Sequence, residues 1–215
     1  MARTLIDARF WDRAARKYAA DPIADMGGYE RTLDATRSYL KSTDLAYEFG
    51  CGTGTTALKL APSVARITAT DISSEMIAIA REKAAAEGCA NVVFEVGTPD
   101  AASCPDESID VAMGFNILHL VKAREAALAG VYRLLKPGGL FISKTPCLKE
   151  MNFAIRLVLP AMQLIGQAPY VAVFSAEALE SEIAGAGFKI VERARHGTRG
   201  KDARVFLVAR KGGAG

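Results

Sequence analysis

Three glycines and two acidic residues are spaced so that they could bind a small ligand. The glycines are Gly50, Gly52 and Gly54. Glu48 precedes them by two residues, and Asp71 ends the next apolar run. Glycine lets the backbone turn tightly and approach a ligand without an intervening Cβ atom. The spacing is not the G-x-G-x-x-G pattern of dinucleotide-binding loops, because residue 55 is Thr, and it is not a phosphate-binding P-loop.

The two carboxylates indicate which ligand the loop suits. Glu48 is poorly placed for a diphosphate but suits a positively charged amino group. Asp71, at the end of the second apolar run, could accept hydrogen bonds from both hydroxyls of a ribose. S-adenosylmethionine carries both an amino acid end and a ribose. As structural alternatives, Glu48 could only bind loop amides, and Asp71 could only cap a helix.

Apolar runs that alternate with helical patterns predict the elements that must position these residues. Strands are expected at residues 45–49, 66–70, 92–96, 109–114, 140–144, 188–192 and 203–209. Helices are expected at residues 4–20, 29–40, 55–60, 74–87, 122–135 and 176–186. This alternation predicts an α/β fold, a single Rossmann-like seven-stranded and mostly parallel sheet with helices on both faces. Ligands of such sheets bind outside the carboxyl ends of the strands, where the glycines lie.

Four stretches resemble, in order, the motifs of class I S-adenosylmethionine-dependent methyltransferases. They are LAYEFGCGTG at residues 45–54, TATDIS at 68–73, FEVGTPDAASCPDESIDVAMGFNILHLV at 94–121, and RLLKPGGLF at 133–141. The resemblance implies methyl transfer from S-adenosylmethionine to a small or lipophilic acceptor, at O, N or S, with S-adenosylhomocysteine as product. It also implies an antiparallel last strand. We further expect an N-terminal helical lid and a helical insertion after the fifth strand.

The resemblance assigns cofactor-binding roles residue by residue. The three glycines would line the methionine portion, with Glu48 ordering the loop or meeting the amino group and Tyr18 touching the carboxylate. Asp71 would hold the ribose. The expected neighbours of the adenine are Ile72, Met76, Gly97 and Thr98. Many relatives have Asp where this chain has Thr98, whose hydroxyl accepts a weaker hydrogen bond, and Asp100 could substitute for it.

Asn116 and His119, just after the fourth expected strand, are the candidate catalytic residues. Asn116 would lie beneath the cofactor and contact the cofactor or the acceptor. His119, with an ordinary pKa of about 6.5, could act as the base that a hydroxyl acceptor needs and an amine does not. A packed histidine is the alternative. Cys51 is interpreted as a small loop residue, because transfer to an external acceptor needs no covalent intermediate.

The chain of 215 residues, 50% hydrophobic and 24% charged, suits a single domain with a sizeable core. Within it we expect a helical cap at residues 1–42, a cofactor-binding core at 43–146, an apolar substrate-side insertion at 147–175, and a closing helix and strands at 176–215. The apolar insertion could pack on the core, line a hydrophobic acceptor pocket, or touch a membrane with help from Arg156 and a basic loop.

The formal net charge is +3, and the basic residues are concentrated near the end of the chain. They are Arg193, Arg195, Arg199, Lys201, Arg204, Arg210 and Lys211. Such a segment is a solvated loop or a contact for an anionic substrate or a membrane surface. Nothing indicates nucleic acid, and two histidines without a C-x-x-C pair do not indicate a metal site. The N-terminal charges do not resemble a signal peptide, so we expect a cytoplasmic protein.

Three other functions stay open from the sequence, as does the oligomeric state. An NAD(P)-dependent oxidoreductase could use the same glycine-rich loop, although Glu48 and Thr55 argue against it. A protein could bind S-adenosylmethionine without turnover. An RNA methyltransferase is disfavoured because the basic residues are confined to one loop.

Overall fold

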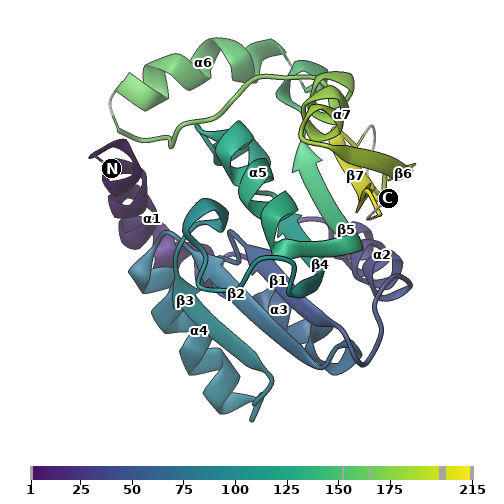
Figure 1. Cartoon of the computed structure of the whole chain (residues 1–215). Helices are drawn as coiled ribbons and strands as arrows, with labels where there is room; N and C mark the ends of the chain where they lie inside the picture. Colours follow the sequence, from purple (N-terminus) through teal and green to yellow (C-terminus); the bar gives the residue numbers. More distant parts are fainter. Residues whose placement is uncertain (1, 152, 165, 199–201, 214–215) are drawn as a thin grey trace.

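The computed structural model describes residues 2–151, 153–164, 166–198 and 202–213, and for residues 2–6 and 153–157 it describes the backbone only. Seven strands form one sheet in the order β3-β2-β1-β4-β5-β7-β6 (Figure 1). The strands are β1 (Leu45–Phe49), β2 (Arg66–Asp71), β3 (Val92–Val96), β4 (Ile109–Phe115), β5 (Leu135–Pro146), β6 (Phe188–Ala194) and β7 (Arg204–Lys211).

Helices connect the strands and cover the sheet. The α-helices are α1 (Ala2–Ala20), α2 (Met26–Arg37), α3 (Thr55–Leu60), α4 (Ser74–Ala86), α5 (Arg124–Leu134), α6 (Phe153–Leu164) and α7 (Ala176–Gly185). Four single 3₁₀ turns lie between them, η1 (Ala61–Ser63), η2 (Pro99–Ala101), η3 (Leu118–Leu120) and η4 (Leu148–Glu150). In Figure 1, α6 lies at the top of the molecule, above α5 and on the side of the N-terminal helix α1.

The first five strands run parallel, and β7 pairs antiparallel with both β5 and β6. Strand order reverses between β1 and β4, because the chain moves from β1 outward to β2 and β3 and then returns to the other side of β1. A crevice forms at the carboxyl ends of strands where order reverses in this way. The predicted α/β fold and the antiparallel last strand are therefore confirmed.

Alternate residues of each central strand face two separate layers of the core. Tyr47 of β1 and Ala112 of β4 pack with α5 and α7 on one face. Their neighbours Ala46 and Met113 pack with α2, α3 and α4 on the other. Both faces of the sheet are thus buried, which explains why the strands read as nearly continuous apolar runs.

Residues 136–139 differ from the expectation. The sequence Lys136-Pro137-Gly138-Gly139 predicts a turn that stops a helix before a strand at residue 140. In the structure β5 begins at Leu135, which pairs with Ile109, and the register then shifts so that Leu140 pairs with Val111. The intervening residues form a bulge, with Gly138 at φ 78°, which is a common place for proline and glycine in a strand.

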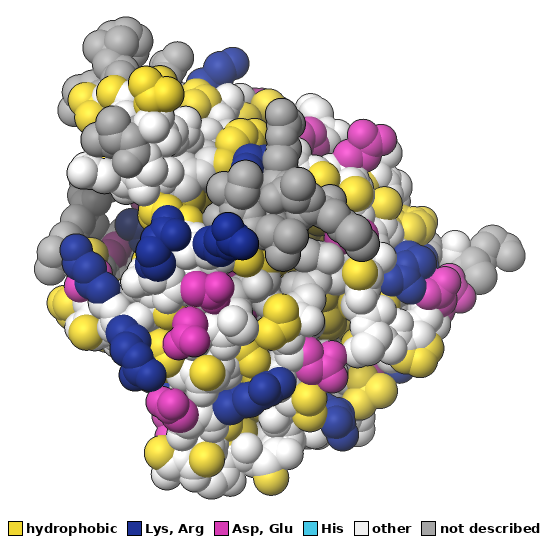
Figure 2. Space-filling model, turned by 90° about the vertical axis from the view of Figure 1, so that its left-hand side faces the viewer, with side chains coloured by type: hydrophobic (Ala, Val, Ile, Leu, Met, Phe, Trp, Pro, Cys, Tyr) yellow, Lys and Arg dark blue, Asp and Glu magenta, His cyan; other side chains and the backbone are white. Residues whose placement is uncertain are grey.

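The apolar insertion contains the 12-residue helix α6, with Pro160 inside it. Of the helices that the structure describes, none is both long and apolar enough to cross a membrane. Figure 2 shows hydrophobic side chains gathered at the top of the molecule, where Figure 1 places α6.

Candidate active site

A cavity of about 690 Å³, here named the large cavity, opens at the carboxyl ends of the parallel strands. Successive strand ends contribute most of the predicted site residues to its wall. They are Gly50 and Gly52 after β1, Asp71, Ile72 and Met76 after β2, Gly97 and Thr98 after β3, Asn116 and His119 after β4, and Tyr18 from α1. Glu48 and Gly54 are the predicted residues that do not line it. Asp100, the substitute considered for Thr98, does line it.

The glycine-rich loop needs glycine for two different reasons. Gly50 has φ 62°, and a Cβ atom there would overlap the side chain of Ile117 in the cavity wall. Gly54 has φ 76°, and a Cβ atom there would lie 2.8 Å from both the Cβ atom of Ala80 and the ring of Phe94. Gly50 therefore shapes the cavity directly, whereas Gly54 lets α4 and β3 pack behind the loop.

Asp71 ties the first two strand ends together. Its Oδ2 accepts a hydrogen bond of 2.9 Å from the backbone N–H of Gly52, and its Oδ1 accepts one of 2.9 Å from that of Ser73. Burial raises the pKa of the Asp71 carboxyl, while these backbone hydrogen bonds oppose the increase. Each carboxylate oxygen can accept a further hydrogen bond, so Asp71 can still bind hydroxyl groups in the cavity.

Glu48 lies behind the loop, only 2% exposed. Among the residues that the structure describes, no hydrogen-bond donor reaches its Oε2 atom. Loss of solvent, with a smaller contribution from the charge of Asp71, raises the pKa of Glu48 to about 8. A buried carboxyl oxygen without a donor is costly, so this atom suits a positively charged or hydrogen-bonding partner that the chain itself does not supply.

Helix α1 covers one side of the large cavity. Its Asp12 accepts a 2.7 Å hydrogen bond from the hydroxyl of Ser73 and a 3.2 Å hydrogen bond from the backbone N–H of Glu75, at the start of α4. Tyr18 and Trp11, in an edge-to-face contact with ring centroids 6.3 Å apart, line the cavity from the same helix. These contacts place α1 where the sequence predicts a lid.

Asn116 has a left-handed backbone with φ 54°, a conformation that asparagine tolerates better than most residues. Its N–H donates a 2.7 Å hydrogen bond to the carbonyl of Lys144 on β5, which fixes this conformation. The exposed Asn116 side chain thus stands at the end of β4 where the crevice opens. Non-glycine residues held in this conformation are often found at functional sites.

His119 differs from the expectation of an ordinary imidazole. Its Nδ1 atom is buried, and no described residue forms a hydrogen bond with it. Loss of solvent lowers the pKa of His119 to about 4. The ring is therefore neutral at pH 7, and it is a much weaker base than a histidine of pKa 6.5.

Sequence reasoning missed a second cavity of about 310 Å³, which shares Tyr18, Phe115 and Asn116 with the large one. We name it the cationic cavity because Lys83, Lys144 and Arg204 line it. The available sequence signal was a lysine, Lys144, inside the apolar strand β5. The structure alone brings it together with α2, α4 and β7.

Comparison with known proteins shows what the central part of the chain is similar to. Residues 46–139 match the model of a methyltransferase domain family. This part of the chain is similar to a methyltransferase domain. Solved structures that share the fold are described as S-adenosylmethionine-dependent methyltransferases. The matched residues contain the glycine-rich loop, Asp71 and the end of β4, that is, most of the large cavity.

Relatives of the methyltransferase domain act on different acceptor atoms. A malonyl-[acyl-carrier protein] O-methyltransferase of Serratia marcescens is 28% identical over 138 residues, which are 64% of this chain and 51% of that protein. A ubiquinone/menaquinone biosynthesis C-methyltransferase of Rubrivivax gelatinosus is 35% identical over 92 residues, 42% of this chain and 35% of that protein. The chain thus spans about half or less of the length of these curated relatives.

A solved structure shows the same fold over nearly the whole chain. The S-adenosylmethionine-dependent methyltransferase of Thermotoga maritima, described as a possible histamine N-methyltransferase, superposes with a TM-score of 0.71 at 24% identity. The match covers 94% of this chain and 99% of that one. The segments outside residues 46–139 therefore also share the fold of that structure.

Proposed function

We propose that this protein transfers a methyl group from S-adenosylmethionine to a small or lipophilic acceptor and releases S-adenosylhomocysteine. The observation that supports this most strongly is the pair of carboxyl groups around the glycine-rich loop. Asp71 faces the large cavity with hydrogen-bonding capacity left over, and Glu48 keeps a buried oxygen without a donor. A ribose and a positively charged amino group match these two acceptors.

The remaining predicted cofactor contacts fit the same orientation. Asp71 would accept hydrogen bonds from the ribose hydroxyls, with Gly50 and Gly52 beside the methionine portion. Tyr18 lies against the loop, since a Cβ atom at Gly52 would be 3.8 Å from the Tyr18 ring. The proposed adenine neighbours in the cavity wall are Ile72, Met76, Gly97 and Thr98. Asp100 is available at the same wall as a stronger acceptor than Thr98.

Catalysis in this proposal depends mainly on orientation. When bound, S-adenosylmethionine supplies a methyl group activated by its sulfonium charge. The chain holds the two reactants in line, an effect that can contribute roughly 7–11 kcal/mol. Trp11 and Tyr18 of α1, with Tyr170 beyond α6, surround the cavity and exclude water. Asn116 positions the acceptor, and the neutral His119 can accept a hydrogen bond from an acceptor hydroxyl.

The acceptor class remains part of the proposal. The expectation of an O, N or S acceptor omitted carbon, which the name of the Rubrivivax gelatinosus relative prints as the methylated atom. The apolar residues Leu120, Val121 and Val171, which line the large cavity, support a small or lipophilic acceptor. Lining residues come from the proposed cap, core and insertion alike, which supports reading residues 1–215 as one domain.

Calorimetric titration with S-adenosylhomocysteine tests the proposal directly, with NADH as the competing ligand. We expect saturable binding of the former only, followed by release of S-adenosylhomocysteine from S-adenosylmethionine with at least one member of a broad acceptor panel. Binding of NADH alone would favour an oxidoreductase. Binding of S-adenosylhomocysteine without turnover on any acceptor would favour a non-catalytic binding protein.

We also propose a cytoplasmic location with peripheral membrane contact through α6. All four cysteines are free thiols in the structure. Val158 and Leu164 of α6 are 54% and 89% exposed. The side chain of Arg156 and the basic residues Arg199 and Lys201 lie outside the described residues. Flotation with liposomes, with and without anionic lipid, tests this contact, and absence of binding to both would remove it.

A further inference from the structure

The cationic cavity adjoins the large cavity at Asn116, which lines both. Residues from seven elements meet there, although they are far apart in the sequence. The charged side chains that line it are the cations Lys83, Lys144 and Arg204 and the carboxylates Asp21 and Asp25, and Thr32, Thr53 and Thr55 lie among them. Because Tyr18, Phe115 and Asn116 line both cavities, a molecule that occupies the smaller one can extend into the larger one.

Lys144 is the most constrained cation of this cavity, only 5% exposed. Its ammonium group donates a 2.8 Å hydrogen bond to the hydroxyl of Thr32 and a long one of 3.4 Å to the carbonyl of Gly28. Within the described part of the chain, no carboxylate lies at ion-pair distance from it. Loss of solvent lowers the pKa of Lys144, so the buried charge is held at a cost that an anion in the cavity would offset.

Two further cations approach the same space. The ammonium group of Lys83 donates 3.0 Å hydrogen bonds to the hydroxyls of Thr53 and Thr55 and also lacks a carboxylate partner among the described residues. Arg204, at the exposed rim, is 3.9 Å from Asp202, which is a weak ion pair. The cavity therefore combines cationic groups with hydroxyl donors, the composition that recognises oxyanions.

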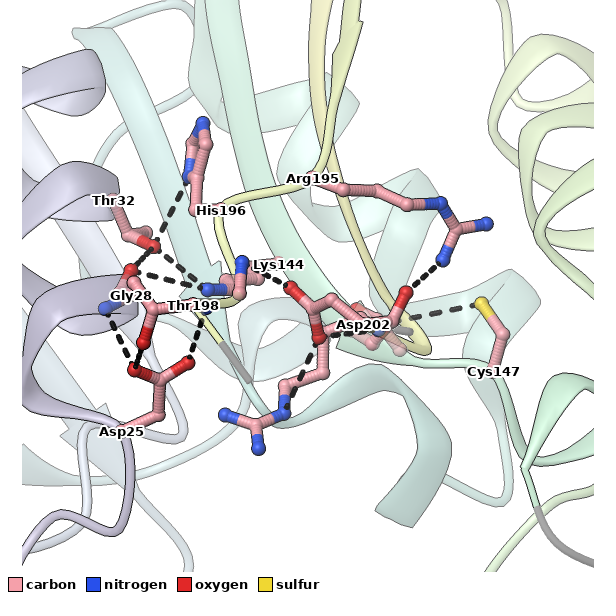
Figure 3. A network of polar contacts seen from close by, with 12 residues as sticks. Asp25, Gly28, Thr32, Lys144, Cys147, Arg195, His196, Thr198 and Asp202 are labelled. Carbon is pink, nitrogen blue, oxygen red and sulfur yellow. Dashed lines mark hydrogen bonds and ion pairs between the residues drawn. The ribbon is translucent and has the colours of Figure 1, made fainter. Parts of the chain in front are cut away.

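Acidic residues at the cavity are already engaged or exposed. Asp25 accepts hydrogen bonds from the backbone N–H groups of Gly28, at 3.0 Å, and Thr198, at 2.9 Å. Figure 3 shows this carboxylate between the start of α2 and the loop that leads to β7. Asp21 is exposed where α1 ends. The charges of Asp202 and Asp25 partly oppose the decrease in the pKa of Lys144 that loss of solvent causes.

The wall around Lys144 is built in advance by hydrogen bonds between distant segments. His196 Nδ1 lies 3.1 Å from the hydroxyl of Thr32, the same hydroxyl that accepts from Lys144 (Figure 3). The Thr198 side chain also bonds to Asp25. These contacts hold α2, β5 and the β6–β7 loop in one arrangement. A ligand that binds there would not bear the entropic cost of ordering the cationic side chains.

We infer that the cationic cavity binds an oxyanion, a carboxylate or phosphate, carried by the methyl acceptor. The inference rests on the proposed function and narrows the acceptor to an anionic compound. Anchoring the oxyanion at Lys144 directs the rest of the acceptor past Asn116 into the large cavity. The charged end is then separated from the position where methyl transfer takes place.

The experiment measures anion binding to the full chain saturated with S-adenosylhomocysteine. Inorganic phosphate, benzoate and the uncharged benzamide are titrated by calorimetry into the wild type, Lys144→Met and Arg204→Gln. Lys136→Met is the matched control, because Lys136 pairs with Asp110 and lines neither cavity. We expect benzoate or phosphate to bind the wild type and the control, with about tenfold or greater loss in Lys144→Met, a smaller loss in Arg204→Gln, and no binding of benzamide.

The relative affinities for phosphate and benzoate assign the class of oxyanion, and either one supports the inference. Circular dichroism and thermal unfolding show whether each variant is folded. Equal anion binding by all variants, or no anion binding by the wild type, would overturn the inference while leaving the proposed function in place. A parallel loss of S-adenosylhomocysteine affinity in Lys144→Met would also overturn it, because the cations would then serve the cofactor. Failure of the wild type to bind S-adenosylhomocysteine would remove both proposals.

Discussion

The large cavity and the cationic cavity share Asn116 but differ in the balance of their charged side chains. The large cavity is lined by Asp7, Asp71, Asp100 and Lys122, and the buried Glu48 lies behind it. The smaller one is lined by the cations Lys83, Lys144 and Arg204 together with Asp21 and Asp25. The large cavity therefore favours a ligand with a positive end, and the smaller one favours a ligand with a negative end.

The chain also builds the two cavities in different ways. Most of the large cavity comes from loops that directly follow consecutive parallel strands, so its residues lie in a regular sequence order. The cationic cavity depends on contacts such as Lys144 with Thr32, separated by 112 residues, and His196 with Thr32, separated by 164. The first kind of site is fixed by the fold, whereas the second can change with a few distant substitutions.

Gly50→Ala tests whether the glycine-rich loop of the large cavity tolerates an added methyl group. Of the variants considered, it should have the largest effect on stability and on S-adenosylhomocysteine binding. A methyl group at φ 62° would overlap Ile117. We expect a loss of about 3 kcal/mol in the free energy of unfolding together with loss of S-adenosylhomocysteine binding. Thermal unfolding and calorimetry measure both.

The matched control is Gly88→Ala. Gly88 has φ 64°, but nothing lies within 4 Å of the added methyl group. Only the backbone conformation is then penalised, by about 1 kcal/mol, and binding is retained. Equal behaviour of the two variants would contradict the role given to Ile117.

Asp71→Ala removes a carboxylate from the large cavity and none from the cationic one. We expect at least tenfold weaker S-adenosylhomocysteine binding, about 1.4 kcal/mol, because both the ribose and the N–H of Gly52 lose an acceptor. Calorimetry measures the effect, with the exposed Asp34→Ala as control. Unchanged affinity in a folded Asp71→Ala protein would remove the site assignment.

Glu48→Gln should weaken the binding of S-adenosylhomocysteine and stabilise the folded protein at high pH. The pKa of about 8 in the folded protein lies above the ordinary value of 4.5. This group therefore contributes stability below about pH 4.5 that is lost as pH rises through 8. At pH 9 we expect a higher Tm for Glu48→Gln than for the wild type, with weaker S-adenosylhomocysteine binding because the amino group loses its counter-charge. A lower Tm of the variant at pH 9 would contradict the burial of an unpaired carboxyl.

His119 should give the smallest effect, a missing inflection in the pH profile. Its pKa of about 4 lies below the ordinary 6.5, so the stability that it contributes is present above pH 6.5 and lost as pH falls toward 4. We expect kcat/KM to show no inflection from this residue near pH 6.5. The NMR signals of the His119 ring protons should not shift with pH above about pH 5. Titration near pH 6.5 would contradict the lowered pKa and would make His119 a candidate base again.

The sequence predicted the parts of the molecule that depend on residues close together in the chain. Strand ends, glycines and Asp71 fall in order along the chain, so their gathering at one edge follows from a parallel sheet. The low pKa of His119 and the missing donor at Glu48 depend on what surrounds a side chain, which spacing does not encode. Lys144 shows the same limit more strongly, because its partners on α2 and in the β6–β7 loop are distant in sequence.

The contact of Asp12 with the beginning of α4 has a consequence for the N-terminal segment. One aspartate of α1 completes the capping of the helix that follows the proposed ribose-binding turn. A nucleoside that stabilises this turn must therefore also stabilise α1, and by thermodynamic reciprocity removal of α1 must weaken nucleoside binding. Amide hydrogen exchange along α1 would thus report whether a nucleoside occupies the turn before α4.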